Sequence, residues 1–546
     1  MPTVTNTAQS HPPWFDGSTP SADQCVLPRV IENRAARSPN STLVVFEDGT
    51  AWTAGETLQR MHAMAELLAS HGVCRGDRIP AWLPNGADLL QAWLGCNFLG
   101  AVFVPLNTDY RGSILEHALR ECEASLMLLH PKLADRITLV GDAAPEKLIL
   151  CGPGTTERDL PGAIQIESLP VLAESVPAAA SLGPWDLQMV IFTSGTTGPS
   201  KGVLCPYGHI YSTAMSTYGY LTESDTMLTE LPMFHVGGSA SIMAAFCCDS
   251  KLALFSGFST RDYWNRIASV GATATSGLIG SMADFLAQAP PAPTDPDNTL
   301  RMVTLMLTEQ AIRVSERFGF SYLSGFNMTE LSGPLISEVD CRVAGALGRP
   351  RSGCECRVVD DHDLAVGADE IGELVVRSDY PWTFSSGYLN QPQATAEAWR
   401  NGWFHTGDLV SKDKDGNYFF VDRKKDSIRR RGENVSSAEV EAEAVAHPGI
   451  KEACAVAVPS ELAEDEILLA YVTGGDEAPS PRALADFLIQ RMPHFMVPRF
   501  FRAMTSLPRT PTNKIRKVEI RSEGITADCW DREAAGITLK RTRFTD

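Results

Sequence analysis

Short apolar runs and stretches with helical periodicity alternate along the first part of the chain. Between about Val30 and Ala180, the amphipathic pattern TLQRMHAMAELLASHG is typical of a helix. Four aliphatic runs of strand length accompany it, TLVVFE, AVFVPL, SLMLLH and KLILCG. The same order resumes later with SKLALF and a helix through DYWNRIASVG. This alternation predicts an α/β fold.

The pattern changes twice toward the C-terminal end. From about Gly353 to Val421, the runs CRVVDD, GELVVRS and NYFFVD are short, strand-like and separated by Gly/Asp turns, which predicts a small β-rich subdomain. The stretches ACAVAVP, EILLAYV and SPRALADFLIQRM then return to α/β order. We therefore predict a large N-terminal domain of α/β subdomains plus the β-rich one, residues 1–423, and a small α+β C-terminal domain, residues 424–546.

Two further segments mark surface features. The connector APPAPTDPDN, residues 289–298, is rich in proline and predicts an exposed loop. The run RKKDSIRRR, residues 423–431, places six basic residues in nine positions at the predicted domain boundary. A solvated basic patch is one interpretation of such a run. Its position between two domains favours a hinge.

The composition limits the classes of protein to consider. A chain of 546 residues corresponds to roughly three or four domain-sized units. Its 44% hydrophobic and 21% charged residues are typical of a soluble globular protein, and no apolar run approaches the ~18 residues of a membrane span. A formal net charge of −19 argues against a nucleic-acid partner but leaves room for a local basic pocket that binds a small phosphorylated ligand.

Cysteines and the N-terminal segment add an expectation about the compartment. The 13 cysteines show neither zinc-ligand nor C-x-x-C spacing, so we expect reduced thiols and no structural metal. No Lys or Arg precedes Arg29 and no apolar stretch follows the N-terminal residues, so neither a secretory signal nor a transit peptide is expected. The expected localisation is cytoplasmic.

The stretch FTSGTTGPSKG, Phe192 to Gly202, follows the apolar run LQMVI and indicates a phosphate-binding loop. Its glycines let backbone N–H groups face an anion, its hydroxyls add donors, and Lys201 adds a positive charge. It is not a Walker A loop, because Ser200 precedes the lysine and Gly202 follows it. A Gly/Thr-rich surface turn remains the alternative for the loop taken alone.

Further motifs follow in order: LPMFHVGG, GFNMTE, WFHTGD, VDRKKDSIRRRGENVSSAEVE and PRTPTNKIRK. Together with the phosphate-type loop they resemble those of the adenylate-forming acyl-CoA synthetases, which share a fold with firefly luciferase and nonribosomal peptide adenylation domains. The resemblance covers nearly the whole chain. The segment GENVSSAEVE is most similar to carnitine/crotonobetaine-CoA ligases.

The resemblance implies a two-step reaction. A carboxylic acid attacks ATP to give an acyl adenylate and pyrophosphate, and the thiol of coenzyme A then displaces AMP. Attack of one anion on another requires that their repulsion be cancelled, so Mg²⁺ and a lysine are expected. By motif position, the implied catalytic residues are Lys514, Thr329, Glu330 and His235, with Glu330 as the ligand of Mg²⁺, a cation that prefers oxygen ligands.

The resemblance also implies binding and hinge residues. Lys425 is the implied hinge about which the C-terminal domain rotates between the two steps, and Gly432 the residue at the mouth of the coenzyme A tunnel. The implied acyl pocket includes His235, Gly237, Gly277 and Gly325. The implied ATP/AMP-binding residues are Thr193, Ser194, Gly195, Thr196, Thr197, Gly198, Lys201, Phe326, Asn327, Asp408 and Arg423. Taken singly, each has a structural alternative: a turn aspartate, a surface arginine or lysine, a helix-capping acid or a core histidine.

One segment departs from the family pattern. Between Leu300 and Phe318 the family usually carries a glycine-rich loop against which adenine lies, whereas this chain has no glycine there and is a few residues short. Misplacing the α-phosphate by about 1 Å can cost on the order of a hundredfold in rate. A thioesterification-only enzyme, which takes a preformed acyl adenylate from a partner adenylating ligase, is therefore an alternative to the complete ligase. A non-catalytic nucleotide sensor is a third.

The identity of the acid is not specified by the motifs. Small residues follow His235, and Ser276, Gly277, Gly280 and Ser281 cluster in the segment that usually lines the acyl pocket. Few bulky walls suggest a bulky, hydrophobic acid of the kind found in secondary metabolism, although helix packing would use the same residues. The expected partners are this acid or its adenylate, ATP and coenzyme A. The oligomeric state, a homodimer included, is left open.

Overall fold

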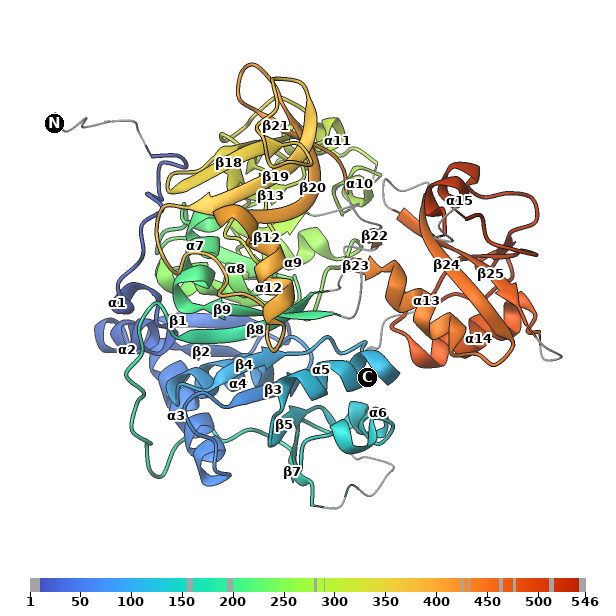
Figure 1. Ribbon diagram of the computed structural model, residues 1–546. Helices are drawn as coiled ribbons and strands as arrows, with labels where there is room; N and C mark the ends of the chain where they lie inside the picture. The colour runs from blue at the N-terminus through green and yellow to red at the C-terminus, as the bar shows by residue number, and fades with distance from the viewer. Residues whose placement is uncertain are drawn as a thin grey trace.

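The computed structural model describes residues 10–154, 160, 162–193, 200–278, 282–288, 290–423, 427–430, 433–460, 465–474, 478–509 and 515–539 (Figure 1). In these residues, three seven-stranded sheets build the large domain, and a hairpin and a four-stranded sheet build the C-terminal part. The predicted α/β architecture, with a β-rich subdomain and a smaller α+β domain, is confirmed.

The first sheet has the strand order β7-β6-β5-β3-β4-β8-β9 and carries the phosphate-type loop at one edge. All its strands are parallel except β9, which returns antiparallel to β8. Three of the aliphatic runs form β4, β5 and β6, as predicted. The strands are β3 (Arg78–Trp82), β4 (Val102–Pro105), β5 (Leu126–Leu129), β6 (Lys147–Cys151), β7 (Ile164–Ile166), β8 (Leu187–Thr193) and β9 (Lys201–Pro206).

The second sheet has the order β14-β13-β12-β10-β11-β1-β2 and is parallel except for β2. Carboxyl ends of parallel strands meet at one edge, which is the usual place for ligands in α/β sheets. The strands are β1 (Thr42–Phe46), β2 (Ala51–Thr53), β10 (Thr226–Thr229), β11 (Lys251–Leu254), β12 (Ala274–Leu278), β13 (Met302–Leu305) and β14 (Ser321–Leu323).

Helices fill the space between these two sheets and cover their outer faces. One continuous core joins both sheets to α2 (Leu27–Arg37), α3 (Ala54–Ser70), α4 (Ala87–Phe98), α7 (Tyr207–Tyr218) and α8 (Val236–Cys247). The outer face of the first sheet packs against α5 (Gly112–Cys122) and α6 (Ala134–Ile137). The outer face of the second packs against α9 (Tyr263–Val270), α10 (Met282–Ala287) and α11 (Glu309–Phe318).

The third sheet is antiparallel and has the order β15-β16-β17-β21-β20-β19-β18. It begins at Gly325, earlier than the predicted start near Gly353, because two-residue strands leave no alternating pattern in the sequence. Its strands are β15 (Gly325–Phe326), β16 (Leu335–Ile336), β17 (Ala346–Pro350), β18 (Cys354–Val359), β19 (Ile371–Ser378), β20 (Phe404–Lys412) and β21 (Tyr418–Arg423). The remaining short helices of the large domain are α1 (Ala22–Cys25), α12 (Pro392–Ala398), η1 (Pro131–Leu133), η2 (Gly141–Ala143) and η3 (Arg400–Gly402).

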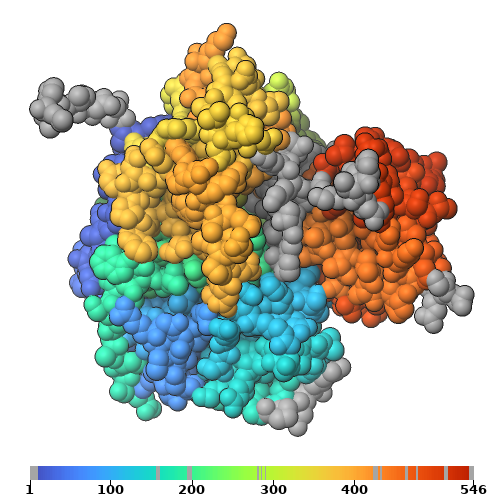
Figure 2. All heavy atoms as spheres, in the orientation of Figure 1, coloured from blue at the N-terminus to red at the C-terminus, as the bar shows by residue number. Residues whose placement is uncertain are grey.

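The C-terminal residues form a separate lobe beside the large domain (Figure 2). The hairpin of β22 (Ser427–Arg430) and β23 (Glu433–Ser436) precedes a sheet in the order β24-β25-β26-β27. Its strands are β24 (Ile450–Pro459), β25 (Asp465–Thr473), β26 (Phe500–Ala503) and β27 (Trp530–Asp531). One face packs against α13 (Ser437–Val445) and α14 (Pro481–Arg491), the other against α15 (Lys517–Glu523). Among the described residues, no helix meets the length and apolarity that a bilayer crossing demands.

Candidate active site

The phosphate-type loop joins β8 to β9, where Thr193 lies opposite Lys201 and its hydroxyl donates to the Lys201 carbonyl over 3.3 Å. Ser200, the last loop residue, is 2% exposed. Its N–H donates to the Glu439 carboxylate over 2.9 Å, and its carbonyl lies 2.7 Å from His117 Nε2. The predicted phosphate-binding residues Ser194, Gly195, Thr196, Thr197 and Gly198 lie outside the described residues.

Lys201, Tyr388 and Glu330 form one contact chain from this loop to the GFNMTE motif. The ammonium of Lys201 lies 4.8 Å from the centroid of the Tyr388 ring, a cation–π distance. The Tyr388 hydroxyl donates to Glu330 Oε1 over 2.7 Å. Burial and the Glu330 carboxylate together raise the pKa of Tyr388, so its hydroxyl stays protonated and acts as a donor. Tyr388 therefore links the buried Glu330 carboxylate to the Lys201 ammonium.

The GFNMTE motif itself is held by its backbone. Glu330 is buried, and its carbonyl accepts the N–H of Ser385 over 3.0 Å. The Asn327 side-chain oxygen accepts the N–H groups of Met328 and Gly333, so this residue closes the loop after β15. Phe326 is 8% exposed and packs in the core of the third sheet. These contacts show how Phe326 and Asn327 are held within the protein, and their contact with a purine stays a prediction.

Asp408 lies in the middle of β20 and is 3% exposed. It pairs in register with Arg423 at the end of β21, so the two predicted ribose-binding positions are neighbours. The Thr406 hydroxyl accepts the Asp408 N–H and donates to the Leu374 carbonyl, which fixes the turn around Gly407. The side chain of Arg423 lies outside the described residues.

His235 is the N-cap residue of α8 and lies at the domain interface. Its Nε2 is 2.8 Å from Glu433 Oε2, the first residue of β23. Asn85 holds the preceding loop from both sides, since its side-chain nitrogen donates to the Leu231 carbonyl and its oxygen accepts the Met233 N–H. Strand β23, which begins directly after the predicted tunnel residue Gly432, therefore faces the predicted acyl-carboxylate position at His235. Gly432 and Lys425 lie outside the described residues.

The small residues assigned to the acyl pocket have different surroundings. Gly277 lies within β12 at φ +128°, a conformation that favours glycine, and Gly325 would meet the Leu335 carbonyl at 2.8 Å if it carried a Cβ. A Cβ on Gly238 would lie 2.1 Å from the Pro232 carbonyl, so the close approach of the loop before α8 explains that glycine. Gly237 would contact Leu231 at 3.1 Å. Gly280 and Ser281 lie outside the described residues.

The segment that usually carries the adenine loop is short. β13 ends at Leu305 and α11 begins at Glu309, so three residues connect them. The Thr308 hydroxyl caps α11 by accepting the Ala311 N–H, and the Leu307 carbonyl accepts the Gly345 N–H. Met306 is 48% exposed at the carboxyl edge of the second sheet. No glycine-rich shelf is present in this connection.

Several contacts of the site could not be found by reading the motifs. Tyr388 is separated from Glu330 by 58 positions and belongs to none of the motifs used. Glu433 and Glu439 lie in GENVSSAEVE, but nothing in that pattern says which of its acids face the large domain. In the described part of the C-terminal domain, carboxylates that contact the large domain include Glu433 at His235, Glu439 at Ser200 and Glu443 at Ser113.

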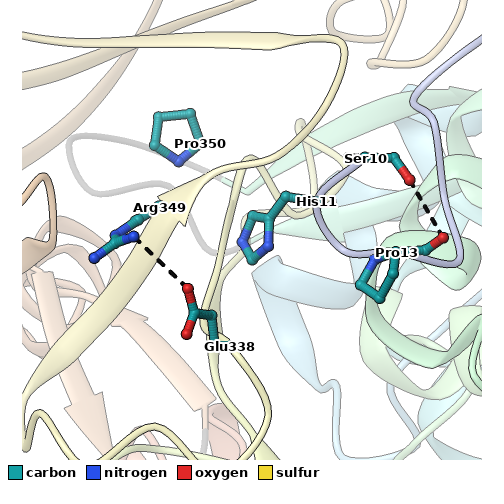
Figure 3. A pocket seen from close by; sticks show the side chains of 6 residues that line it. All are labelled: Ser10, His11, Pro13, Glu338, Arg349 and Pro350. Carbon is teal, nitrogen blue, oxygen red and sulfur yellow. Dashed lines mark hydrogen bonds and ion pairs between the residues drawn. The ribbon is translucent and has the colours of Figure 1, made fainter. Parts of the chain in front are cut away.

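Other features lie apart from this region. A surface cavity of about 450 Å³ is lined by the N-terminal segment around His11 and by Glu338 and Arg349, which form a 3.7 Å ion pair (Figure 3). Its lining shares no residue with the motifs. Within the described ranges, no group of three or more His, Cys, Asp or Glu side chains is arranged to hold a metal ion.

Contacts among Lys201, Tyr388 and Glu330, and between the C-terminal hairpin and His235, bring residues of the separate motifs together. Comparison with protein families then identifies the class of enzyme. The family model "AMP-binding enzyme" matches residues 31–389, and "AMP-binding enzyme C-terminal domain" matches residues 439–514. The chain belongs to this AMP-binding enzyme family.

Similar proteins match this chain over most of its length. A crotonobetaine/carnitine–CoA ligase of Salmonella paratyphi A is 30% identical over 480 residues, covering 85% of this chain and 92% of its own. One from Escherichia coli is also 30% identical, covering 84% and 91%. The amide bond synthetase McbA from Marinactinospora thermotolerans has a TM-score of 0.78 at 23% identity, covering 91% of this chain and 99% of its own. The o-succinylbenzoate CoA synthetase (MenE) from Bacillus subtilis has a TM-score of 0.75 at 23%, covering 90% and 98%.

Proposed function

We propose that the protein is an AMP-forming acyl-CoA ligase, which activates a bulky, hydrophobic carboxylic acid as the acyl adenylate and then transfers the acyl group to coenzyme A. The main observation behind this proposal is the pair of contacts that links Lys201, Tyr388 and Glu330 at the end of the phosphate-type loop. The 30% identity to carnitine-type CoA ligases over most of the chain supports the choice of thiol.

The first step is assigned as follows. The phosphate loop and Lys201 hold the polyphosphate, and Asp408 accepts hydrogen bonds from the ribose hydroxyls. Glu330 is a buried oxygen donor next to the phosphate site, which suits Mg²⁺, because this cation is usually held by one or two carboxylates together with phosphate oxygens. When bound, Mg²⁺ would supply charge neutralisation at the phosphates. Thr329 donates to the α-phosphate, and Lys514 offsets charge between the acid and the α-phosphate.

The second step is assigned to the domain orientation described above. Glu433 next to Gly432 lies against His235, so the hairpin β22–β23 faces the acyl site. The residues that flank 510–514 belong elsewhere on the small domain: Arg509 and Ile515 form a β-bridge, and Arg509 pairs with Glu452 of β24. In Figure 1, α15 lies at the top of this domain, whereas the hairpin β22–β23 lies between the two domains. This orientation suits thioester formation, and rotation about Lys425 would exchange the two faces.

One observation favours a second candidate, a thioesterification-only enzyme. The three-residue connection between β13 and α11 offers no glycine-rich shelf for adenine. A preformed acyl adenylate, which is also anchored by its acyl chain, would depend less on that shelf than ATP would. Such an enzyme would need a partner ligase that supplies the adenylate.

A paired assay on the full chain separates the two candidates. Thioester formation is measured first from synthetic acyl adenylates plus coenzyme A, then from the matching free acids plus Mg-ATP and coenzyme A. The complete ligase runs both reactions, and the thioesterification-only enzyme consumes the adenylate alone. Failure of both across a panel of aromatic and aliphatic acids contradicts the proposed function.

A further inference from the structure

Strand β20 departs from regular pairing with β19 at Asp408. The register pairs on either side are Val375 with His405 and Glu373 with Leu409, so Leu374 alone lies opposite residues 406–408. Gly407, in the middle of this segment, has a φ of +71°, a conformation that favours glycine. Residues 406–408 therefore form a bulge, and a bulge redirects the side chains that it carries.

Side chains bind two backbone N–H groups of this bulge. The Thr406 hydroxyl accepts the Asp408 N–H over 3.1 Å and donates to the Leu374 carbonyl over 2.7 Å. The Gly407 N–H donates to Glu373 Oε1 over 3.1 Å. Thr406 belongs to the bulge itself, whereas Glu373 belongs to the neighbouring strand. The Glu373 carboxylate therefore ties the middle of the bulge to β19.

Glu373 is itself held in place, and it is 4% exposed. Arg400 Nη2 donates to Glu373 Oε2 over 3.2 Å, and His405 Nδ1 lies 3.4 Å from the same oxygen. Asp363 lies on the other side of this pair, 3.4 Å from Arg400 and 3.8 Å from His405 Nε2. A buried carboxylate needs such partners to offset the loss of water. With Oε2 held by these partners, Oε1 accepts the Gly407 N–H.

Asp408 is the residue whose position the bulge sets. It follows Gly407 directly, is 3% exposed and pairs in register with Arg423 of β21. In the proposed function, its carboxylate accepts hydrogen bonds from the ribose hydroxyls of the nucleotide. Hydrogen bonds weaken steeply as their distance and angle leave the favourable range, so a bulge that shifts would weaken this contact.

We propose that Glu373 is a positioning residue for nucleotide binding, which fixes the bulge 406–408 and so places the Asp408 carboxylate for the ribose hydroxyls. The inference rests on the proposed function, in which Asp408 binds the ribose. Glu373 acts through the bulge and does not touch the nucleotide. Its effect is therefore confined to binding energy that depends on the ribose hydroxyls.

The test compares binding of AMP, 2′-deoxy-AMP and 3′-deoxy-AMP to the full chain by calorimetry. In the unmodified protein, loss of either hydroxyl should weaken binding about tenfold or more, because a buried carboxylate then lacks a donor. Glu373→Gln keeps the size of the side chain, but either orientation of its amide sets a donor against Gly407 or against Arg400. We expect this variant to bind AMP about tenfold more weakly and to discriminate among the three nucleotides by less than about threefold.

Asp363→Asn is the matched control, because it alters the contacts of Arg400 and His405 on the side away from the bulge. It should lower the melting temperature and leave the discrimination unchanged. Thr406→Val loosens the bulge by a second route, since it removes the hydroxyl that accepts the Asp408 N–H. It should reduce the discrimination as Glu373→Gln does, and Thr406→Ser, which keeps the hydroxyl, should restore it.

The positioning role is overturned if Glu373→Gln or Thr406→Val discriminates as the unmodified protein does, or if Asp363→Asn loses discrimination as well. If the unmodified protein does not bind AMP, or if Asp408→Asn discriminates normally, the ribose contact of the proposed function fails instead. Hydrogen exchange of the peptide 404–409 then decides whether Glu373 fixes the bulge. Exchange must be faster in Glu373→Gln than in Asp363→Asn, and equal rates overturn the inference.

Discussion

The contact between Glu439 and Ser200 predicts that docking of the C-terminal domain against the large domain depends on pH. In the docked orientation the pKa of Glu439 is about 7, raised mainly by burial and further by Glu443, while the Ser200 N–H lowers it. The proposed rotation of the C-terminal domain would expose this carboxyl, and its pKa would then return toward the ordinary value of 4.5. The docked orientation therefore binds a proton more tightly. It is favoured at low pH and loses stability as the pH rises from about 4.5 to about 7.

The size of the effect follows from the two pKa values. A pKa unit corresponds to ~1.4 kcal/mol, so the shift amounts to about 3 kcal/mol in total. Between about pH 5.5 and pH 8, roughly 2 kcal/mol of this is lost, which is on the order of twentyfold in the docking equilibrium. Glu439→Gln has no titrating carboxyl and should lose none of it.

The assay compares kcat/KM for thioester formation from acyl adenylate in the two proteins across this pH range. Because both use the same coenzyme A, titration of the thiol cancels in the ratio. The ratio of unmodified protein to Glu439→Gln should fall by about tenfold or more from pH 5.5 to pH 8. Parallel pH profiles would show that the carboxyl does not titrate with docking, and the reasoning would then be wrong.

Three further substitutions test separate parts of the site. Tyr388→Phe removes the hydroxyl that donates to Glu330 but keeps the ring beside Lys201. A hydrogen bond to a charged group contributes about 1.5–3 kcal/mol, so the rate of acid activation should fall about tenfold or more. The Mg²⁺ concentration required for acid activation should also change, whereas thioester formation from the adenylate should be spared. Glu433→Gln should slow thioester formation and leave acid-dependent pyrophosphate exchange into ATP unchanged, because Glu433 pairs with His235 in the orientation proposed for thioester formation. Loss of both activities would speak against this assignment. Lys514→Ala should abolish activity with acid plus ATP while sparing the adenylate reaction, and equal loss of both refutes its role.

The sequence predicted the layered part of the fold well, for a physical reason. Buried parallel strands are continuous aliphatic runs, so KLILCG and SLMLLH could be recognised without their neighbours. The third sheet was only partly recognised, since β15 and β16 have two residues each and are defined by their partners. The start of that subdomain was accordingly placed too late along the chain.

The motifs selected the candidate site residues, but the contacts that hold those residues could not be predicted from the sequence. Glu330 and Lys201 were selected from separate motifs, and the link between them is Tyr388, which no motif marked. The contact between Ser200 and Glu439 joins residues 239 positions apart. Such contacts depend on how domains dock, and no periodicity records this. For the small residues after His235, the sequence left a wide acyl pocket and close packing as alternatives; at Gly238 the Pro232 carbonyl leaves no space for a side chain, so close packing alone requires a glycine there.

The short connection after β13 and the carboxylates at the domain interface bear on the same question, namely which part of the nucleotide would contribute most to binding. With no glycine-rich shelf between Leu305 and Glu309, the proposed nucleotide binding would rely more on a ribose contact at Asp408 and on phosphate contacts at Lys201. Of these parts of the nucleotide, only the β- and γ-phosphates leave when the acyl adenylate forms. In the proposed reaction, occupancy of the phosphate-type loop would therefore differ most between the two stages, and Glu439 of the C-terminal domain contacts the end of that loop at Ser200.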